Sequence, residues 1–413
     1  MKFFIYGILL TLLLFSCSDK RPMERMNDPE LRSYANELAH KYIITDGHID
    51  LPDHLMGKKI RVDRASINVL VSTNDGEFDY ERAKKGGLDA PFMSIYIPAS
   101  YQLKTDKGKA RADSMITMVR DIASIIPDKF ALANSVEEVE KNFKERKISL
   151  PMGMENGAPL GDDIKNVKYF YNRGIRYITL THNKDNQICD SSGDTTHTWN
   201  GLSPFGRKVV EEMNHVGIMI DISHVDDSTF YQVMKLTKAP CIASHSSCRH
   251  FAPTVRRDMT DDMIRRLGEN DGVVEINFYT NFLSGKVALE NKKLDSLLKI
   301  EGLKPEDSLA KPILALLRKK SRAPVVNVET VANHIDHVVK LAGIDHVAFG
   351  SDFDGVGGSH YLPDGLKDVS QYLNLIYALL KRGYSEADIE KICSGNVFRV
   401  WRKVAEVAKR QPK

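Results

Sequence analysis

The sequence lacks a strong charge of either sign. Its 58 lysine and arginine residues nearly balance 55 aspartate and glutamate residues, so the 413-residue chain has a formal charge of only +3, and no basic block stands out. A basic patch or stripe is the usual electrostatic footprint of nucleic-acid binding. The composition therefore predicts no nucleic-acid partner.

Internal repeats, low-complexity tracts and a GxGxxG fingerprint after the first predicted strand are also lacking. These absences argue against a solenoid and against an open dinucleotide-binding sheet. Apolar residues make up 42% of the chain, which is enough for a sizeable core. An α/β barrel needs about 250 residues, so this length suits one barrel with insertions.

Long apolar runs are lacking except at the N-terminus. Lys2 precedes an apolar run, residues 3–15, that is short for a spanning helix of about 20 residues. Leu14–Cys17 resembles a bacterial lipobox, so we expect residues 1–16 to be a lipoprotein signal peptide and Cys17 to carry the lipid. An uncleaved N-terminal membrane helix is the alternative. Both interpretations predict an exported protein held on a membrane, facing the periplasm or the cell surface.

Cysteine is scarce in the rest of the chain. Cys189, Cys241, Cys248 and Cys393 show neither CxxC pairing nor the even spacing of a disulfide scaffold. An exported chain could join two of them, but the sequence does not show which.

The pattern of apolar runs predicts one α/β domain. Residues 17–37 are mostly polar and suit a tether, and the domain is expected over residues 38–413. Helical periodicity, as at 209–215, 229–236 and 330–341, alternates with β-branched runs, which predicts a (β/α)8 TIM-type barrel with helical insertions. The largest insertion, about 283–324, is expected to form helices over one end of the barrel, either as a lid or as a solvated excursion. The eight strand candidates are 42–49, 92–97, 149–154, 176–181, 217–223, 240–244, 272–278 and 346–351.

Residue types that bind metals occur where the predicted strands end. The carboxyl ends of barrel strands meet at one mouth, so side chains at these positions come together. A lone histidine or glutamate at a strand end more often makes a hydrogen bond or a salt bridge, but several at one mouth predict a metal site. The residues are His48, Asp50, Glu155, His182, His224, His245 and Asp352.

The spacing of these residues supports a site for two ions. His48 and Asp50 are two residues apart, so on an extended chain both side chains point to one face and can bind one ion. Glu155 would be costly to bury without a cation or a donor, and a carboxylate can place one oxygen on each of two metals about 3.5 to 4 Å apart. His224 and His245 end successive strands and would lie side by side.

Eight stretches spread over residues 42 to 404 carry a family resemblance. They are DGHIDLP, GMENG, YITLTHN, GLSPFGRKVVEEMNHVGIMIDISHV, ASHSS, RRDMTDDMI, INFYTNF and FGSDFDGV. With them the chain resembles the membrane, or renal-type, dipeptidases of the amidohydrolase superfamily. The resemblance implies two Zn²⁺ ions per chain and suggests a homodimer. His48 and Asp50 look like ligands of one zinc, His224 and His245 look like ligands of the other, and Glu155 looks like the bridge.

The resemblance also implies roles in catalysis and substrate binding. Asp352, the first aspartate of GSDFDG, looks like the acid/base group, and His182 looks like the residue that contacts the scissile carbonyl. Arg257 looks like the binder of the substrate carboxylate, with its neighbour Arg256 as a competitor. Tyr279, in INFYTNF, is expected to contact the substrate.

One departure from the family pattern concerns the wall of the pocket. The family often has an aromatic residue directly after HxDLP, but Asp53 stands there in this chain. The side-chain preference therefore stays open.

The expected activity is hydrolysis of dipeptides by a metal-activated water. Two alternatives stay open. One is another amidohydrolase-type reaction, on a lactone or a phosphotriester, and the other is a non-enzymatic lipoprotein that binds metal or peptide. Retention of Asp352 beside the predicted ligands argues against pure binding, because binding needs no proton shuttle.

Overall fold

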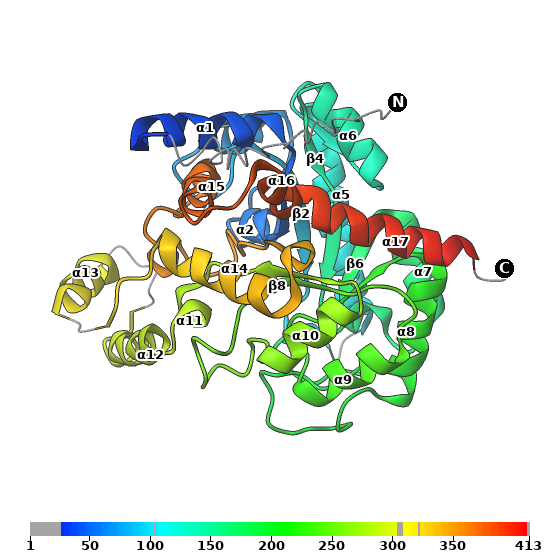
Figure 1. Cartoon of the computed structure of the whole chain (residues 1–413). Coiled ribbons are helices and arrows are strands. Elements are labelled where there is room, and N and C mark those ends of the chain that lie inside the picture. Colours follow the sequence, from blue (N-terminus) through cyan, green and yellow to red (C-terminus); the bar gives the residue numbers. More distant parts are fainter. Residues whose placement is uncertain (1–25, 103–104, 304–308, 321–322, 411–413) are drawn as a thin grey trace, which may run out of the picture.

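The computed structural model describes residues 26–102, 105–303, 309–320 and 323–410, and its centre is one parallel sheet of eight strands. In order around the sheet these are β1 (Ile44–Ile49), β2 (Leu88–Tyr96), β5 (Met152–Glu155), β6 (Ile175–Thr179), β7 (Met219–Asp221), β8 (Ile242–Ser246), β9 (Val273–Ile276) and β10 (Val347–Phe349). The ring closes where Asp50 N donates to Phe353 O (2.9 Å) and Asp352 N donates to His48 O (3.1 Å). The predicted (β/α)8 barrel is confirmed (Figure 1).

Each barrel strand overlaps one predicted segment, but the segment 149–154 divides into two strands. Its first part belongs to β4 (Ile148–Leu150), which pairs with β3 (Phe130–Leu132) in a separate two-stranded sheet. Its second part is β5 of the barrel. Pro151 stands between them and has no N–H to donate to a continuous ladder.

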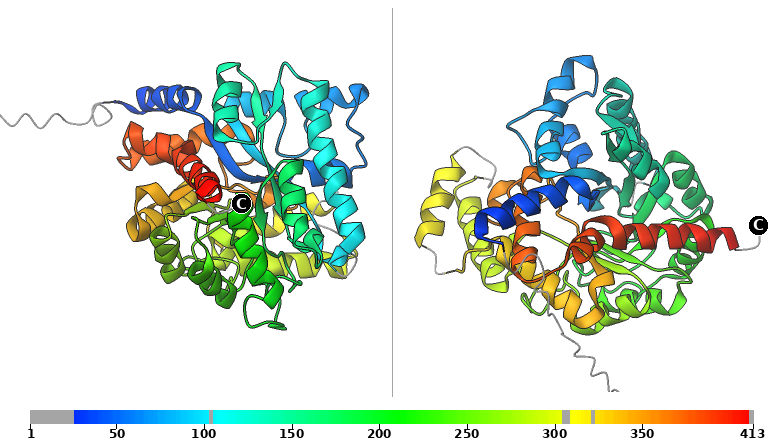
Figure 2. Two further views of the ribbon diagram at one scale, coloured as in Figure 1. Left: turned by 90° about the vertical axis from the view of Figure 1, so that its right-hand side faces the viewer. Right: turned by 45° about the horizontal axis from the view of Figure 1, so that its top comes forward.

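Helices cover the outside of the barrel (Figures 1 and 2). Those between and after the strands are α2 (Leu51–Gly57), α3 (Ile67–Val71), α4 (Tyr80–Gly86), α5 (Thr105–Ile125), α6 (Val136–Lys144), α7 (Lys165–Arg173), α8 (Pro204–Val216), α9 (Asp227–Leu236), α10 (Asp261–Glu269), α14 (Val328–Ala342), α15 (Tyr372–Lys381), α16 (Glu386–Glu390) and α17 (Asn396–Arg410). The three segments with predicted helical periodicity lie within α8, α9 and α14.

Helix α8 shows how local sequence sets these elements. Ser203 Oγ accepts from Gly206 N (2.8 Å), and Pro204 follows at the first turn, where its missing N–H costs nothing. Val209 lies on the buried face of the helix. Gly217 ends the helix at φ +91°, a backbone conformation that favours glycine.

The domain begins earlier than residue 38. Helix α1 (Asp28–Lys41) covers part of the segment expected to be a tether, and Leu31 and Ala35 on it are buried. Helices α1 and α15 lie side by side (Figure 2). Tyr34, with its hydroxyl 2.7 Å from Glu386 of α16, adds a polar contact. Helix α1 buries few apolar residues in an otherwise polar segment, so its amphipathic pattern is weak. For this reason the sequence did not predict the helix.

The predicted insertion is helical. Its described residues form α12 (Gly285–Ile300) and α13 (Ala310–Lys320), and the short helix α11 (Thr280–Leu283) ends where the insertion begins. Helices α12 and α13 share a small core of their own, built from Leu294, Leu298, Ala310 and Leu314. They lie at the periphery, beyond α11 and α14 (Figure 1).

Apolar side chains and α17 close the end of the barrel opposite the carboxyl ends of the strands. Asn396 Nδ2 donates to Val347 O (2.8 Å), at the first residue of β10, and so places α17 there. Trp401 of α17 packs on Phe92, which in turn packs on Tyr177 (ring centroids 5.3 and 5.4 Å). Access to the interior is therefore from the other end, where the polar residues lie.

The four cysteines of the domain are buried free thiols, so the structure shows no disulfide among the residues it describes. Cys17 and the predicted signal peptide lie outside the described residues. Across the described ranges, no helix combines the length and apolar character that crossing a membrane needs.

Candidate metal centre

The carboxyl ends of the strands surround a cavity of about 320 Å³. Six of the seven predicted residues line it, and the seventh, His48, is buried beneath them at the end of β1. The lining residues are Asp50, Asp53, Tyr96, Glu155, His182, Asn183, His224, His245, Tyr279, Phe282, Asp352, Asp354, Gly355 and Val356. The tertiary structure thus brings the predicted constellation together.

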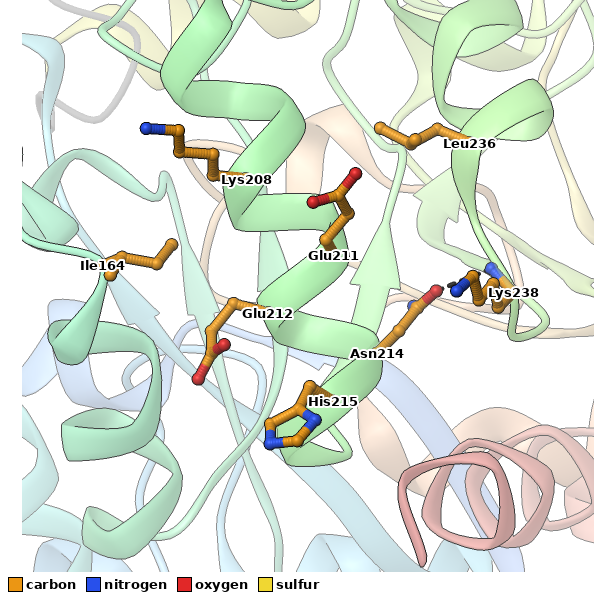
Figure 3. Close-up of a pocket in the computed structure, with 8 residues that line it drawn as sticks. All are labelled: Ile164, Lys208, Glu211, Glu212, Asn214, His215, Leu236 and Lys238. Carbon is orange, nitrogen blue, oxygen red and sulfur yellow. Dashed lines mark hydrogen bonds between the residues drawn. The ribbon is translucent and has the colours of Figure 1, made fainter. Parts of the chain in front are cut away.

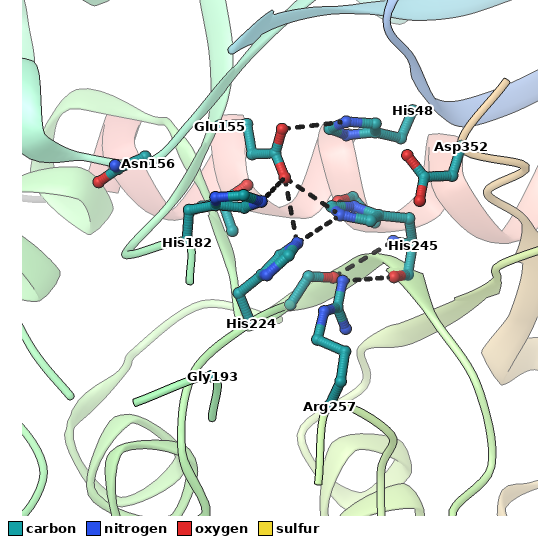
Figure 4. A network of polar contacts seen from close by, with 12 residues as sticks. His48, Glu155, Asn156, His182, Gly193, His224, His245, Arg257 and Asp352 are labelled. Carbon is teal, nitrogen blue, oxygen red and sulfur yellow. Dashed lines mark hydrogen bonds and ion pairs between the residues drawn. The ribbon is translucent and has the colours of Figure 1, made fainter. Parts of the chain in front are cut away.

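Glu155, the last residue of β5, lies at the centre of the cluster (Figure 4). Its Oε2 is 3.4 Å from His48 Nε2, and its Oε1 is 3.1 Å from His224 Nε2 and 3.4 Å from His245 Nε2. Each carboxylate oxygen therefore faces a different side of the cluster. Burial raises the pKa of Glu155, but the imidazoles, led by His182 and His48, hold it well below its usual value.

The orientation of His48 is fixed from behind. Tyr177 Oη donates to Gly47 O (3.0 Å) and lies 2.9 Å from His48 Nδ1. Because the single hydroxyl hydrogen goes to Gly47, Nδ1 of His48 is the donor to Tyr177, and its Nε2 is free to bind a cation. The ring of Tyr177 can reach this position because its neighbour on β5 is Gly153, where a Cβ would lie 1.9 Å from the ring.

His48 Nε2 has no hydrogen-bond partner and lies 3.3 Å from Asp50 Oδ2, as well as near Glu155. Burial lowers the pKa of His48, but Tyr177 and the two carboxylates together raise it well above its usual value. Positive charge is therefore drawn to the space between Nε2 and the carboxylates. A divalent cation fits this donor set, because imidazole nitrogen and carboxylate oxygen are common zinc ligands.

His245 is oriented in the same way. Ser244 Oγ donates to Asp221 Oδ2 (2.7 Å) and so accepts from His245 Nδ1 (2.7 Å). Nε2 of His245 then points toward Glu155 and lies 2.9 Å from Nε2 of His224. Two imidazole nitrogens therefore converge beside one carboxylate oxygen, and this donor set suits a metal ion.

Two cluster residues have left-handed backbone conformations. His224 has φ +69° and Asp352 has φ +65°, although neither is glycine. Such conformations cost about 1–3 kcal/mol and tend to persist at functional sites. They turn the two side chains into the cavity directly after β7 and β10.

Asp352 lies at the edge of the cluster and accepts from Asn277 Nδ2 (2.9 Å). Burial, followed by the charges of Asp50 and Glu155, raises the pKa of Asp352 to about 7. The backbone of Gly355 packs directly against the carboxylates of Asp50 and Asp352. A Cβ at this position would lie 2.2 Å from Asp50 Oδ2 and 2.5 Å from Asp352 Oδ1, so only glycine fits there without displacing a carboxylate.

The structure separates the two candidate arginines. Arg256 is exposed, whereas Arg257 Nη1 donates to Ser246 Oγ and Nη2 to His245 O, both at 2.6 Å. Phe282, which lines the cavity, lies over the Arg257 guanidinium at 5.5 Å. Arg257 is therefore directly behind the cavity wall, and Arg256 is not.

His182 lies within the cluster, with Nε2 at 3.6 Å from Glu155 Oε1. Burial lowers its pKa, which favours the neutral imidazole. Tyr279 lines the same cavity and accepts from Asn281 Nδ2 (2.6 Å).

Sequence reasoning missed the supporting residues Tyr177, Asp221, Ser244 and Asn277. All four lie inside quoted stretches of the family resemblance, but no spacing rule marks them. Their contacts join different strands of the barrel, so only the closed ring brings them to the ligands they orient.

A second cavity, of about 400 Å³, lies along α8 (Figure 3). Its charged residues include Lys208 and Glu211, which are exposed, and Asn214 is bonded to Lys238 N (2.6 Å). This surface groove has no converging buried ligands, unlike the cavity at the barrel mouth.

Comparison with known proteins agrees with this geometry. The sequence profile of the membrane dipeptidase family, peptidase family M19, matches residues 32–413. The chain belongs to this family. It is accordingly a hydrolase of the metallopeptidase class.

Individual relatives match over most of the chain. An uncharacterized dipeptidase of Schizosaccharomyces pombe is 30% identical over 377 residues, which cover 88% of this chain and 81% of the relative. Dipeptidase tcpJ of Claviceps purpurea is 32% identical over 342 residues, covering 81% and 71%. The crystal structure of the probable dipeptidase PvdM from Pseudomonas aeruginosa is 26% identical, with a TM-score of 0.77 and coverage of 92% and 100%.

The contact behind His48 gives a prediction about metal affinity. Tyr177→Phe removes the acceptor of His48 Nδ1–H, so affinity for zinc should fall about 10–100-fold while the fold is kept. Titration of the apo-protein with zinc against a competing chelator measures this. Tyr231→Phe, which removes an exposed hydroxyl bonded to Asp262, is the matched control. Wild-type affinity in the Tyr177 variant would refute the proposed orientation of His48.

Proposed function

We propose that this protein is a binuclear zinc dipeptidase. The observation that carries the proposal is Glu155, whose two oxygens face different imidazoles in one cavity that also contains Asp352. Membership of the membrane dipeptidase family supports dipeptides as substrates.

His48 and Asp50 would hold one zinc ion, and His224 and His245 would hold the other, with Glu155 shared between them. When bound, zinc supplies a water of strongly lowered pKa and a Lewis acid for the carbonyl oxygen. Tyr177 and Ser244 keep the ring nitrogens of His48 and His245 aimed at these positions. The buried carboxylates also leave the site in need of positive charge.

Asp352 would act as the general base and then as the general acid. It would take the proton of the attacking water and return it to the leaving amine, so no covalent intermediate is required. Asn277 holds one of its oxygens in place (2.9 Å) and leaves the other for this exchange. His182 would donate a hydrogen bond to the carbonyl oxygen as negative charge develops on it.

Arg257 would bind the carboxylate of the second residue of the substrate. Its planar guanidinium suits a bidentate contact with a carboxylate. A longer peptide has no carboxylate at this distance from the scissile bond, so the contact would select dipeptides by length and charge.

The first test is enzymatic. A dipeptide panel of mixed chirality should release free amino acids, and a chelator should abolish the release. Asp352→Asn should keep both metals but lose roughly 10²–10⁴-fold in turnover, because the proton acceptor is gone. Asp345→Asn, an exposed acid paired with Lys391, is the control. Normal turnover in the Asp352 variant would mean that another residue is the base.

The second test concerns the carboxylate. Arg257→Ala should impair free dipeptides far more than dipeptide amides, which have no terminal carboxylate. Loss of a bidentate, charge-assisted pair should cost about 2–4 kcal/mol, roughly thirtyfold to a thousandfold in kcat/KM. Arg256→Ala should have a milder effect. Equal losses for acid and amide, or a larger acid-specific loss at Arg256, would contradict the role of Arg257.

We further propose that the enzyme is an exported lipoprotein anchored through Cys17. This rests on the sequence of residues 1–17, with its basic start, short apolar run and final cysteine. Cys17→Ser should give a soluble exported protein or an unprocessed precursor, as shown by fractionation and N-terminal analysis. A variant that is processed after residue 16 yet still membrane-bound would overturn the anchor.

A further inference from the structure

The order of the strands gives the substrate a direction across the cavity. Arg257 follows β8, and Tyr96 ends β2. In a ring of eight strands, β2 is four strands from β8 in either direction, so the two residues lie on opposite sides of the mouth. Glu155 and the imidazoles lie between them. With the substrate carboxylate at Arg257 and the scissile carbonyl at the cluster, the first residue of the substrate extends toward β1 and β2.

On that side of the mouth the wall carries Asp53. It lies in the first turn of α2, three residues after Asp50, so both side chains project from one face of the helix. The side chain of Asp53 is 35% exposed and lines the cavity.

Arg111 of α5 holds Asp53 from behind. It pairs with Asp53 Oδ1 through Nη2, while its Nε donates to Tyr96 O (3.2 Å). Arg111 is only 16% exposed and is not among the described residues that line the cavity. In this ion pair the guanidinium of Arg111 therefore lies on the protein side, and the carboxylate of Asp53 lies on the cavity side.

The cavity has no cation of its own on this side. Its described lining contains five acidic residues and neither lysine nor arginine. Asp50 and Glu155 are the proposed zinc ligands, Asp352 is the proposed base, and Asp354 accepts from Glu77 N (2.6 Å). Asp53 is the remaining carboxylate, and the proposed mechanism gives it no role.

We propose that Asp53 selects dipeptides whose first residue has a cationic side chain, such as arginine or lysine. This inference rests on the proposed dipeptidase function. The α-amino group of the substrate is bonded to the carbon next to the scissile carbonyl, so it stays beside the cluster and Asp50. A side chain of several methylene groups reaches farther, and Asp53 is three residues beyond Asp50, which is about 4.5 Å along the helix axis. An aromatic residue in its place would offer an apolar wall instead.

The test compares two substrates of nearly equal shape, arginyl-alanine and citrullyl-alanine, with the zinc-loaded protein. Citrulline replaces the guanidinium with an uncharged urea, so the ratio of their kcat/KM values isolates the charge. Wild type should prefer arginyl-alanine by about tenfold, the size expected for a half-exposed charged contact, and the preference should weaken with added salt. Asp53→Asn, which keeps the shape and an oxygen that can accept from Arg111, should bring the ratio close to one.

Asp128→Asn is the control, because it removes the same charge at an exposed position outside the cavity lining and should leave the ratio as in wild type. Zinc content and thermal unfolding of the Asp53 variant are measured together with the kinetics. These measurements ensure that the ratio of kcat/KM values refers to a folded enzyme with its zinc bound. Hydrolysis of both substrates without a preference for arginine, or an unchanged ratio in Asp53→Asn, would overturn the inference and leave the dipeptidase function standing. Absence of hydrolysis for every dipeptide would overturn both.

Discussion

The structure depends on the burial of carboxylates at the mouth of the barrel. Glu155 is 4% exposed and Asp50 is 6% exposed, and desolvating such charges is costly unless cations offset them. The surrounding imidazoles aim their ring nitrogens at these oxygens. Bound metal ions would supply the positive charge that these carboxylates need, so the stability of the mouth would depend on the same ions as the proposed chemistry.

The barrel satisfies this constraint through residues that lie outside the lining of the cavity. Tyr177 crosses from β6 to His48 on β1, and Gly153 leaves room for its ring. Asp221 on β7 orients Ser244, and through it His245, on β8. Each contact joins two strands, so the side chains of the cluster are oriented only when the ring of strands is closed. A small change in packing inside the barrel should therefore alter metal binding before it alters the fold.

Charge also gives the cavity two unlike sides. Arg257 stands behind the wall next to β8, and Asp53 faces the cavity next to β1 and β2. A dipeptide has a carboxylate at one end and an amino group at the other, so with the proposed roles of Arg257 and Asp53 such a cavity would fix its direction as well as its length. Arg111 pairs with Oδ1 of Asp53, and the side chain of Asp53 still lines the cavity.

The sequence by itself determined the barrel and the residue types that meet at its mouth, because apolar runs alternate with helical periodicity and polar residues end the runs. Local cues do not show that Pro151 divides one run between two sheets, or that α1 packs on the domain, because both outcomes depend on distant partners. The roles of Tyr177, Asn277 and Arg111, and the difference between Arg256 and Arg257, were decided by the tertiary structure alone. A side chain's direction and its partner come from the closing of the ring, which brings residues far apart in sequence to within hydrogen-bond distance.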